Sequence, residues 1–211
     1  MKRSAVILAG GFSKRFGQSK GLVELAGKPL IHHVLDKTLH IVDKAVVVVS
    51  SDAQRRAFTC LLHDKVDVVV DKLEKQSPLV GALTGFEKVQ GKYLLLLPCD
   101  TPFISSQIVS LLLDLCINRN AAIPRWPNGY IEPFQAAYHT KSALRAAEIA
   151  LEEKKLDMRS MILHMRRVRY VSTMVLRQMD RELLTFFNVN TPADLNRADS
   201  ILHYQYCKSS P

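Results

Sequence analysis

The chain has 211 residues, of which 47% are hydrophobic and 23% are charged, and it carries a formal net charge of +9. These values exclude a disordered or repetitive chain, and they predict a single domain over residues 1–211 with a sizeable core. The excess of cations favours an anionic partner, but charge alone does not choose among nucleic acid, anionic lipid and phosphorylated small molecules.

The N-terminal apolar run is the only candidate for a targeting segment. It ends at Leu8 and is followed at once by Gly10 and Gly11, so it is too short for a signal peptide or a membrane span. We therefore expect a cytoplasmic protein without a membrane partner. The cysteines are scattered without paired spacing, which predicts free thiols at Cys60, Cys99, Cys116 and Cys207.

Strands and helices are expected to alternate along the first half. Short valine- or leucine-rich runs without alternation predict buried strands at Ser4 to Leu8, Ala45 to Val49, Val66 to Val70 and Tyr93 to Leu97. Helical spacing predicts helices at Pro29 to His40, Asp52 to Leu62 and Pro78 to Val89, the last with Ser77 as its cap. This alternation predicts an α/β fold with three layers, in which helices cover both faces of a mostly parallel Rossmann-like sheet.

The second half is less regular. A helix is expected from Ser105 through Ile117, and Thr191 is expected to cap a last helix, with Asp194 reaching back to it. Further strands are expected at Ala121 to Ile123, Phe134 to Tyr138, Arg167 to Val171 and Leu184 to Phe187. Further helices are expected at Lys141 to Glu152, Arg159 to Met165 and Pro192 to Leu202.

A glycine-rich loop follows the first strand and runs from Leu8 to Lys20. Loops at the carboxyl ends of parallel strands are the usual ligand sites of α/β sheets. Glycine lets backbone N–H groups approach a phosphate, and Arg15 and Lys20 can neutralise its charge, so the loop predicts a triphosphate site. It has neither the Walker nor the dinucleotide spacing, and the alternative is a tight strand-to-helix turn.

A carboxylate stands just past the fourth buried strand, at Asp100. Triphosphate chemistry needs a hard cation, usually Mg²⁺, and carboxylate oxygens are its natural ligands. Asp100 is therefore the candidate metal ligand. The alternative is an aspartate that caps a helix or forms a turn.

The string ILAGGFSKRFGQSKGLVELAGKPL resembles the signature of the molybdenum cofactor guanylyltransferase family, within the nucleotidyltransferase superfamily. By this resemblance Leu8, Ala9 and Gly10 contact the base and sugar of a nucleotide, Arg15 and Lys20 contact its triphosphate, and Gly11 and Ser13 belong to the same site. The family usually has an aspartate immediately before the lysine, and Ser19 stands there in this chain.

The resemblance extends over nearly the whole chain, although it is strong only in four short blocks. Cys99 to Pro102 matches the metal motif around Asp100, and by resemblance Asp71 binds guanosine, Ser50 contacts the base and Asn190 completes the metal site. The alternative for Asn190 is a turn residue ahead of the Thr191 cap. The segment from Asn120 to Met165 carries the acceptor-binding part in such folds.

The function implied by the resemblance is transfer of GMP from GTP to the phosphate of molybdopterin, with release of pyrophosphate. Mg²⁺, or Mn²⁺ in its place, would be the cofactor. Arg15, Lys20 and Asp100 would be catalytic, without a protein nucleophile. The implied partners are these small molecules and, transiently, other cofactor-biosynthesis proteins or molybdoenzymes, and no nucleic acid.

Three alternatives stay open. The first is a related transferase with another nucleotide, such as CTP or UTP, or another acceptor, such as cobinamide phosphate, a sugar phosphate or phospholactate. The second is a basic nucleic-acid-binding protein, favoured by the late arginines but not by the 7% aromatic content. The third is a nucleotide-binding regulator or chaperone of a molybdenum enzyme.

Overall fold

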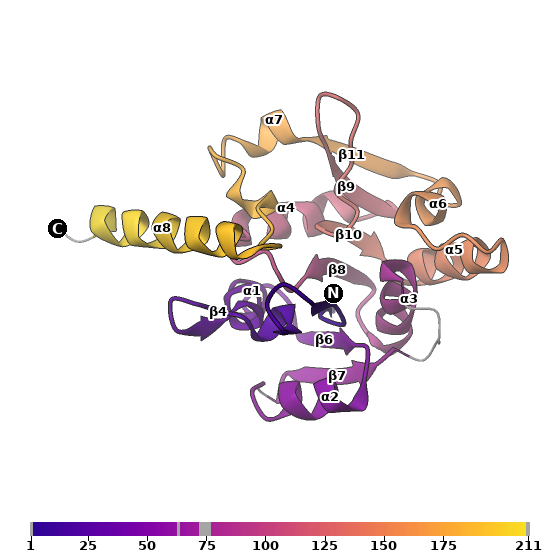
Figure 1. Cartoon of the computed structure of the whole chain (residues 1–211). Helices are drawn as coiled ribbons and strands as arrows, with labels where there is room; N and C mark the ends of the chain where they lie inside the picture. The colour runs from indigo at the N-terminus through magenta and orange to yellow at the C-terminus, as the bar shows by residue number, and fades with distance from the viewer. Residues whose placement is uncertain (1, 63, 72–76, 210–211) are drawn as a thin grey trace.

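The computed structural model describes residues 2–62, 64–71 and 77–209, and it describes side chains as far as residue 204. Strands and helices alternate through this part of the chain (Figure 1). The strands are β1 (Arg3–Leu8), β2 (Phe12–Ser13), β3 (Gln18–Ser19), β4 (Glu24–Leu25), β5 (Lys28–Pro29), β6 (Lys44–Val49), β7 (Val66–Val70), β8 (Tyr93–Pro98), β9 (Ala121–Arg125), β10 (Ala136–His139) and β11 (Val168–Ser172). The α-helices are α1 (Leu30–Thr38), α2 (Asp52–Thr59), α3 (Pro78–Lys88), α4 (Ser106–Cys116), α5 (Thr140–Glu152), α6 (Met158–Leu163), α7 (Thr173–Leu176) and α8 (Pro192–Ser209), with short 3-10 helices η1 (Lys20–Leu22) and η2 (Leu184–Phe186).

The central sheet has seven strands in the order β11-β9-β10-β8-β1-β6-β7. All neighbouring pairs are parallel except those of β10, which runs antiparallel to β8 and to β9. The register sets Ile7 of β1 between Val47 of β6 and Leu97 of β8. The expected α/β fold with a mostly parallel sheet is thus confirmed.

Alternating strand residues feed two separate cores, one on each face of the sheet. Ile7 lies in the core under α1, α2 and α4, and Val6 lies in the core under α3, α5 and α6. Helix α3 packs so closely on β1 that a Cβ on Gly85 would come within 2.3 Å of Val6 Cγ1. The strands are therefore buried on both faces, which is why their sequences are continuously apolar.

The predicted helix caps are confirmed. The Ser77 hydroxyl accepts a hydrogen bond from Val80 N at 3.2 Å, with Pro78 in the first turn of α3. At the start of α8 the Thr191 hydroxyl accepts from Asp194 N at 3.1 Å, while the Asp194 carboxylate accepts from Thr191 N at 2.8 Å. These side chains satisfy N–H groups that have no partner inside their helices.

The predicted strand at Leu184 to Phe187 is wrong, because this segment forms the 3-10 helix η2. Leu183 takes a left-handed conformation with φ of 53°, and Thr185 N donates to the Asp180 carboxylate at 2.7 Å. These local contacts turn an apolar run that resembles a strand into a helical turn. The strand expected from Phe134 begins two residues later, at Ala136.

The glycine-rich segment is more ordered than the expected loop. Phe12 and Ser13 pair with Ser19 and Gln18 as a small antiparallel hairpin, β2 and β3. Gly17 sits in its turn with φ of 66°, a conformation that favours glycine.

Free thiols are confirmed for the described cysteines. Cys60 is exposed, whereas Cys99 and Cys116 are buried, and burial raises the pKa of the Cys116 thiol to about 12. The side chain of Cys207 lies outside the described residues.

Helix α8 extends from the body of the protein towards the C-terminus (Figure 1). Within residues 2–62, 64–71 and 77–209, no helix combines the length and apolar character needed to cross a membrane.

Candidate functional site

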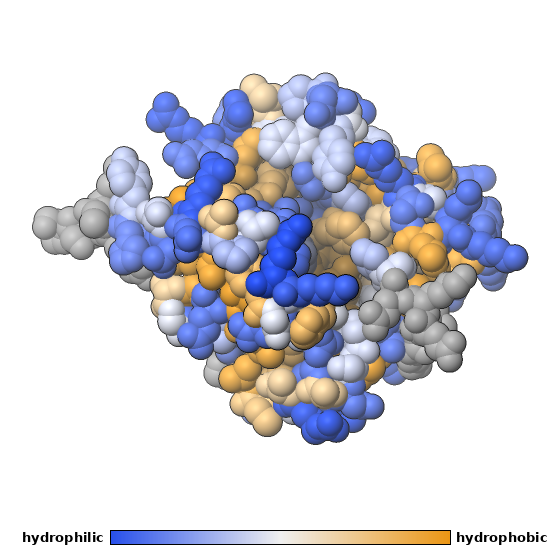
Figure 2. Space-filling model, viewed as in Figure 1, coloured by the Kyte–Doolittle hydropathy of each residue, from blue (hydrophilic) through white to orange (hydrophobic). Residues whose placement is uncertain are grey.

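A pocket of about 510 Å³ opens at the edge of the sheet where the parallel strands end. Strands β6 and β8 lie on opposite sides of β1, so this edge contains the point where the strand order reverses, the usual ligand site of open α/β sheets. Because β10 is antiparallel, the residues that precede it also lie at this edge. Figure 2 shows the hollow in the middle of one face, with apolar and hydrophilic side chains around it.

Two groups of residues face each other across the pocket. The first wall comes from the N-terminal half and consists of Leu8, Gly10, Gly11, Val48, Val49, Ser50, Asp71, Ser77, Pro78 and Gly81. The second wall comes from the C-terminal half and consists of Tyr130, Glu132, Phe134, Gln135 and Asn188. Between them lies a floor of Lys20, Pro98, Asp100 and Asn190.

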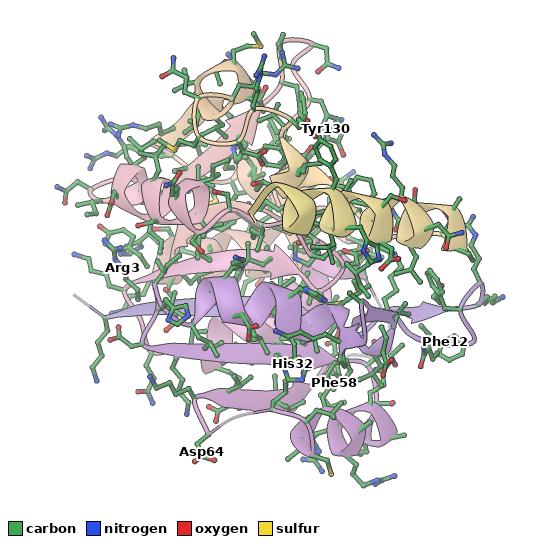
Figure 3. All side chains as sticks on the ribbon, turned by 90° about the vertical axis from the view of Figure 1, so that its left-hand side faces the viewer. Arg3, Phe12, His32, Phe58, Asp64 and Tyr130 are labelled. Atoms are coloured by element: carbon green, nitrogen blue, oxygen red, sulfur yellow. The ribbon has the colours of Figure 1, made fainter. Side chains whose placement is uncertain are left out.

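The hairpin of β2 and β3 delivers Lys20 to the floor of the pocket. Lys20 N donates to the Gly11 carbonyl at 3.2 Å, which brings the two ends of the glycine-rich segment together. Phe12, the first residue of β2, is 63% exposed and lies at the outer edge of the molecule in Figure 3. The hairpin thus places its cation inward and its aromatic ring outward.

A hydrogen-bond network attaches the glycine segment to the turn after β6. The Ser50 hydroxyl donates to the Gly10 carbonyl at 2.7 Å, and Gln54 Oε1 accepts from Ser50 N at 2.8 Å. Gln54 Nε2 donates to the hydroxyl of the buried Ser19 at 2.8 Å. A Cβ on Gly10 would meet Ser50 Oγ at 2.2 Å, so a side chain there would displace the Ser50 hydroxyl from the Gly10 carbonyl. Ser19, which stands where the family usually has an aspartate, is therefore hydrogen-bonded to Gln54 in this chain.

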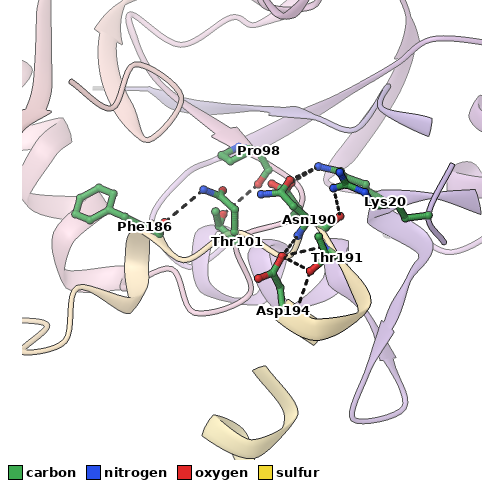
Figure 4. Close-up of polar contacts among 10 residues, drawn as sticks. Lys20, Pro98, Thr101, Phe186, Asn190, Thr191 and Asp194 are labelled. Carbon is green, nitrogen blue, oxygen red and sulfur yellow. Dashed lines mark hydrogen bonds and ion pairs between the residues drawn. The ribbon is translucent and has the colours of Figure 1, made fainter. Parts of the chain in front are cut away.

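The ammonium of Lys20 lies between the two predicted metal ligands. Lys20 Nζ is 3.0 Å from Asp100 Oδ2 and 2.5 Å from Asn190 Oδ1 (Figure 4). Asp100 is only 8% exposed, and its carbonyl accepts from Val189 N at 2.9 Å, which joins the end of β8 to the late segment. Residues 170 positions apart along the chain thus meet around one positive charge.

The start of α8 holds Asn190 in place. The Asp194 carboxylate accepts hydrogen bonds from Asn190 N at 3.1 Å and from the Thr191 hydroxyl at 2.8 Å (Figure 4). The Thr191 hydroxyl is the main cause that lowers the pKa of Asp194 below its ordinary value, followed by backbone N–H groups. The charged carboxylate therefore fixes the backbone from which Asn190 reaches the floor.

The first wall carries one carboxylate, that of Asp71, just past the end of β7. The Thr84 hydroxyl from α3 donates to Asp71 Oδ1 at 3.1 Å, and Asp71 N continues the ladder by donating to the Val49 carbonyl at 2.7 Å. The carboxylate is therefore oriented by a side chain from a different element.

Three residues predicted for the site do not line the pocket, namely Ala9, Ser13 and Arg15. Ala9 is buried, and its N–H donates to the Val48 carbonyl at 2.8 Å. Ser13 is buried in the hairpin. Arg15 is exposed at the rim, where its Nη1 lies 3.5 Å from the Asn190 carbonyl oxygen. The other predicted residues meet in the pocket: Leu8, Gly10, Gly11, Lys20, Ser50, Asp71, Asp100 and Asn190.

The sequence did not single out Glu132, which lies in the second wall. Its Oε1 accepts a hydrogen bond from Trp126 Nε1 at 2.7 Å. Burial raises the pKa of the carboxyl, and the indole hydrogen bond opposes this rise. The sequence did contain a signal for this residue, a lone charge in an otherwise uncharged segment, because Glu132 is the only Asp, Glu, Lys or Arg between Trp126 and Thr140.

No group of three or more His, Cys, Asp and Glu side chains comes together as a metal site within the described ranges. The oxygens of Asp100 and Asn190 are the protein atoms on the floor that converge on a cation. A hard divalent ion such as Mg²⁺ is often bound by one or two protein oxygens together with phosphate and water, and this donor set fits that pattern.

Several late cations have structural contacts. Arg169 donates to the Leu115 carbonyl at 3.2 Å, and Arg159 lies over the ring of Tyr130 at 5.3 Å. Some of the late arginines, which in the sequence favour a nucleic-acid partner, therefore make contacts within the protein.

Residues 5–168 match the family described as "MobA-like NTP transferase domain". A "probable molybdenum cofactor guanylyltransferase" of Methanosarcina mazei is 32% identical over 198 residues, which cover 92% of this chain and 88% of that protein.

Solved structures agree with this match. The crystal structure of molybdopterin-guanine dinucleotide biosynthesis protein A from Archaeoglobus fulgidus superposes with a TM-score of 0.81 at 27% identity, covering 95% of this chain and 99% of that one. A 2-C-methyl-D-erythritol 4-phosphate cytidylyltransferase of Thermus thermophilus superposes with a TM-score of 0.71 at 16% identity, covering 96% and 100% of the two chains. This second likeness shows the fold alone.

Proposed function

The chain belongs to the MobA-like NTP transferase family and is a nucleotidyltransferase, and from this premise we propose that it transfers GMP from GTP to the phosphate of molybdopterin. The products are the guanine dinucleotide form of the cofactor and pyrophosphate. The relative named "probable molybdenum cofactor guanylyltransferase" in Methanosarcina mazei and the Archaeoglobus structure support this choice of substrates.

One observation in the pocket carries the proposal. Lys20 Nζ is held by Asp100 Oδ2 at 3.0 Å and by Asn190 Oδ1 at 2.5 Å, between a wall with glycines and a wall with aromatic rings. A cation fixed in this way is already oriented before substrate arrives. Preorganised charge of this kind stabilises the charge that develops during phosphoryl transfer.

Asp100 and Asn190 would hold the Mg²⁺ ion that the family implies, and Mn²⁺ would fit the same oxygen donors. When bound, the ion supplies positive charge to the phosphate oxygens of the nucleotide. Lys20, already oriented on the same floor by Asp100 and Asn190, would add its positive charge beside the triphosphate. Arg15 lies at the rim, 3.5 Å from the Asn190 carbonyl, and adds a second positive charge from that side.

The first wall, in the N-terminal half of the domain, binds the nucleotide in this proposal. Asp71 accepts the N–H donors of guanine, while Leu8 and Ser50 contact the base or sugar, and Gly10 and Gly11 let the phosphates approach the backbone. Ala9 and Ser13 are buried, so Ala9 would contribute by continuing the ladder after β1 and Ser13 by forming part of the hairpin. The second wall, in the C-terminal half, binds the acceptor.

The chemical step needs no protein nucleophile. An oxygen of the acceptor phosphate attacks the α-phosphorus of GTP, the bond from that phosphorus to the bridging oxygen breaks, and pyrophosphate leaves. The residues of the floor contribute by alignment and by neutralising negative charge, which are the main sources of catalysis in such transfers. The buried Cys99 beside Asp100 takes no part, because burial raises the pKa of its thiol far above neutral pH.

The test is a pyrophosphate-release assay with Mg²⁺ and molybdopterin, in which GTP, CTP, ATP and UTP are offered separately. Release with GTP alone, and only when molybdopterin is present, is the expected result. Release with CTP instead would move the chain to a sister activity with the same fold. No release with any nucleotide, although GTP binds in calorimetry, would mean that molybdopterin is not the acceptor.

The proposal also includes the cellular setting implied by the family. The enzyme acts in the cytoplasm and delivers its product by transient contact with other cofactor-biosynthesis proteins or with molybdoenzymes. In-cell cross-linking of the tagged chain, followed by fractionation, checks both points. Enrichment of the chain in a membrane or secreted fraction would contradict the first.

A further inference from the structure

The second wall is built around the connection between β9 and β10, residues 126–135, which begins with a closed turn. Its base is closed by a bridge between Arg125 and Ile131, and Glu132 N donates to the Pro124 carbonyl at 3.0 Å. Inside the loop, Trp126 N donates to the Tyr130 carbonyl at 2.7 Å. These bonds hold Glu132 and Trp126 in a fixed relation to each other before any ligand enters.

The carboxylate of Glu132 faces the pocket with incomplete compensation. Its one hydrogen bond in the described part of the chain comes from the neutral indole N–H of Trp126, at 2.7 Å, and no cation pairs with it there. The nearest cation of the floor, Lys20, is engaged by Asp100 and Asn190. A half-buried carboxylate of this kind gains free energy when a ligand brings further N–H donors to it.

The surroundings of Glu132 limit the shape and charge of that ligand. Tyr130 and Phe134 line the same wall (Tyr130 is labelled in Figure 3). The guanidinium of Arg159 lies over the Tyr130 ring at 5.3 Å and supports this aromatic surface. A phosphate placed here would be repelled by the carboxylate. These surroundings favour a ligand whose contact with Glu132 is a flat, uncharged ring with N–H groups and whose phosphate is directed towards Lys20 on the floor.

We propose that Glu132 recognises the acceptor by accepting hydrogen bonds from adjacent N–H groups of an aminopyrimidinone ring, as a pterin presents them. The inference rests on the proposed function and adds a specificity residue to it. Guanine carries the same pair of donors, and each wall presents one carboxylate oriented by a neutral donor, Thr84 for Asp71 and Trp126 for Glu132. The two rings of the product would then be read by the same chemistry from opposite sides.

The chain contains its own probe for this contact, because Trp126 is its single tryptophan. We would titrate the protein with 6-hydroxymethylpterin, a pterin without phosphate, and follow the fluorescence of Trp126. The Glu132→Gln variant keeps an oxygen for the indole N–H but turns an N–H₂ group towards the pocket. The affinity of this variant for the pterin should fall about 10- to 100-fold, the range expected when a hydrogen bond to a charged group is lost.

A matched variant serves as the control. Glu153→Gln makes the same chemical change at an exposed residue paired with His164, outside the pocket, and should leave the pterin titration unchanged. Circular dichroism checks that each variant folds, and Trp126→Phe, followed by calorimetry, should weaken the pterin by freeing the Glu132 side chain.

Transfer assays separate this inference from the proposed function. If wild-type protein transfers GMP to molybdopterin, Glu132→Gln should raise the KM for molybdopterin about 10- to 100-fold with the KM for GTP unchanged; equal acceptor KM values would overturn the role of Glu132. If wild-type protein transfers nothing, the proposed function fails and the titration alone decides. Pterin binding that depends on Glu132 then supports the inference, and no binding, or binding indifferent to Glu132→Gln, overturns it.

Discussion

The two walls of the pocket are held together in different ways. The first wall is bonded across several elements, since Gln54 joins Ser50 to Ser19 and Thr84 orients Asp71. The second wall comes mainly from the connection between β9 and β10, and its carboxylate has one neutral partner in the described residues, Trp126. The carboxylate of the first wall is therefore oriented by a side chain from a different element, whereas that of the second wall depends on a local contact within the β9–β10 connection. Substitutions in the two walls should therefore affect different substrates.

The floor lies between the walls, and breaking it should have the largest effect. Asp100→Ala should leave the protein folded but lower turnover by about 100- to 1,000-fold, because single preorganised electrostatic contacts contribute roughly 2.7–4 kcal/mol to such steps. The measurement is pyrophosphate release at saturating GTP and acceptor. Asp67→Ala, which removes an exposed partner of Lys44, is the control. Turnover like that of the wild type would remove Asp100 from the catalytic floor.

A change in the first wall should affect the nucleotide alone. Asp71→Asn should lower kcat/KM for GTP by about 10- to 100-fold, because an amide in place of the carboxylate loses charged hydrogen bonds to the base. Thr84 can still donate to the amide oxygen, so the side chain should stay in place. Comparing kcat/KM for all four nucleotides measures the effect. An equal loss for every nucleotide would show that Asp71 does not read the base.

A positioning residue of the first wall should give a smaller effect. Gln54→Leu leaves the buried Ser19 hydroxyl and Ser50 N without their partner and loosens the Gly10 segment, so kcat/KM for GTP should fall about tenfold. Arg55→Leu, at the next residue of the same helix, is the control, because the Arg55 side chain is exposed and pairs with the exposed Asp52. A loss of acceptor affinity with GTP unchanged would contradict the separation of the walls.

The smallest effect is expected at the α8 cap, which supports Asn190. Thr191→Ala should lower stability by about 1 kcal/mol and the Tm by roughly 2–4 °C, as measured by thermal unfolding. The Thr191 hydroxyl is the main cause that lowers the pKa of Asp194 in the folded protein. The stabilisation from the charged Asp194 carboxylate is therefore present above the ordinary pKa of 3.8 and is lost as pH falls through the lower folded-state pKa. The difference in stability between Thr191→Ala and the wild type should therefore become smaller in acid, and a difference independent of pH would show that the cap does not act through the charge of Asp194.

Much of the fold followed from the sequence. Runs such as Ala45 to Val49 are apolar without alternation because both faces of each strand are covered, so they predicted the buried parallel strands. The caps at Ser77 and Thr191 were equally predictable, since each bond joins residues three positions apart. The wrong strand at Leu184 to Phe187 arose because the left-handed Leu183 and the Asp180 contact leave no pattern in an apolar run.

The candidate site was likewise predictable only in part from the sequence. The sequence by itself determined that glycines and cations follow β1 and that a carboxylate follows β8, because these groups are contiguous with the strands that carry them. Only the tertiary structure decided that Lys20 bridges Asp100 and Asn190, that Gln54 serves Ser19, and that Glu132 enters the pocket. These contacts join residues far apart in sequence, and their positions depend on strand order and on the single antiparallel strand β10, which local periodicity does not encode.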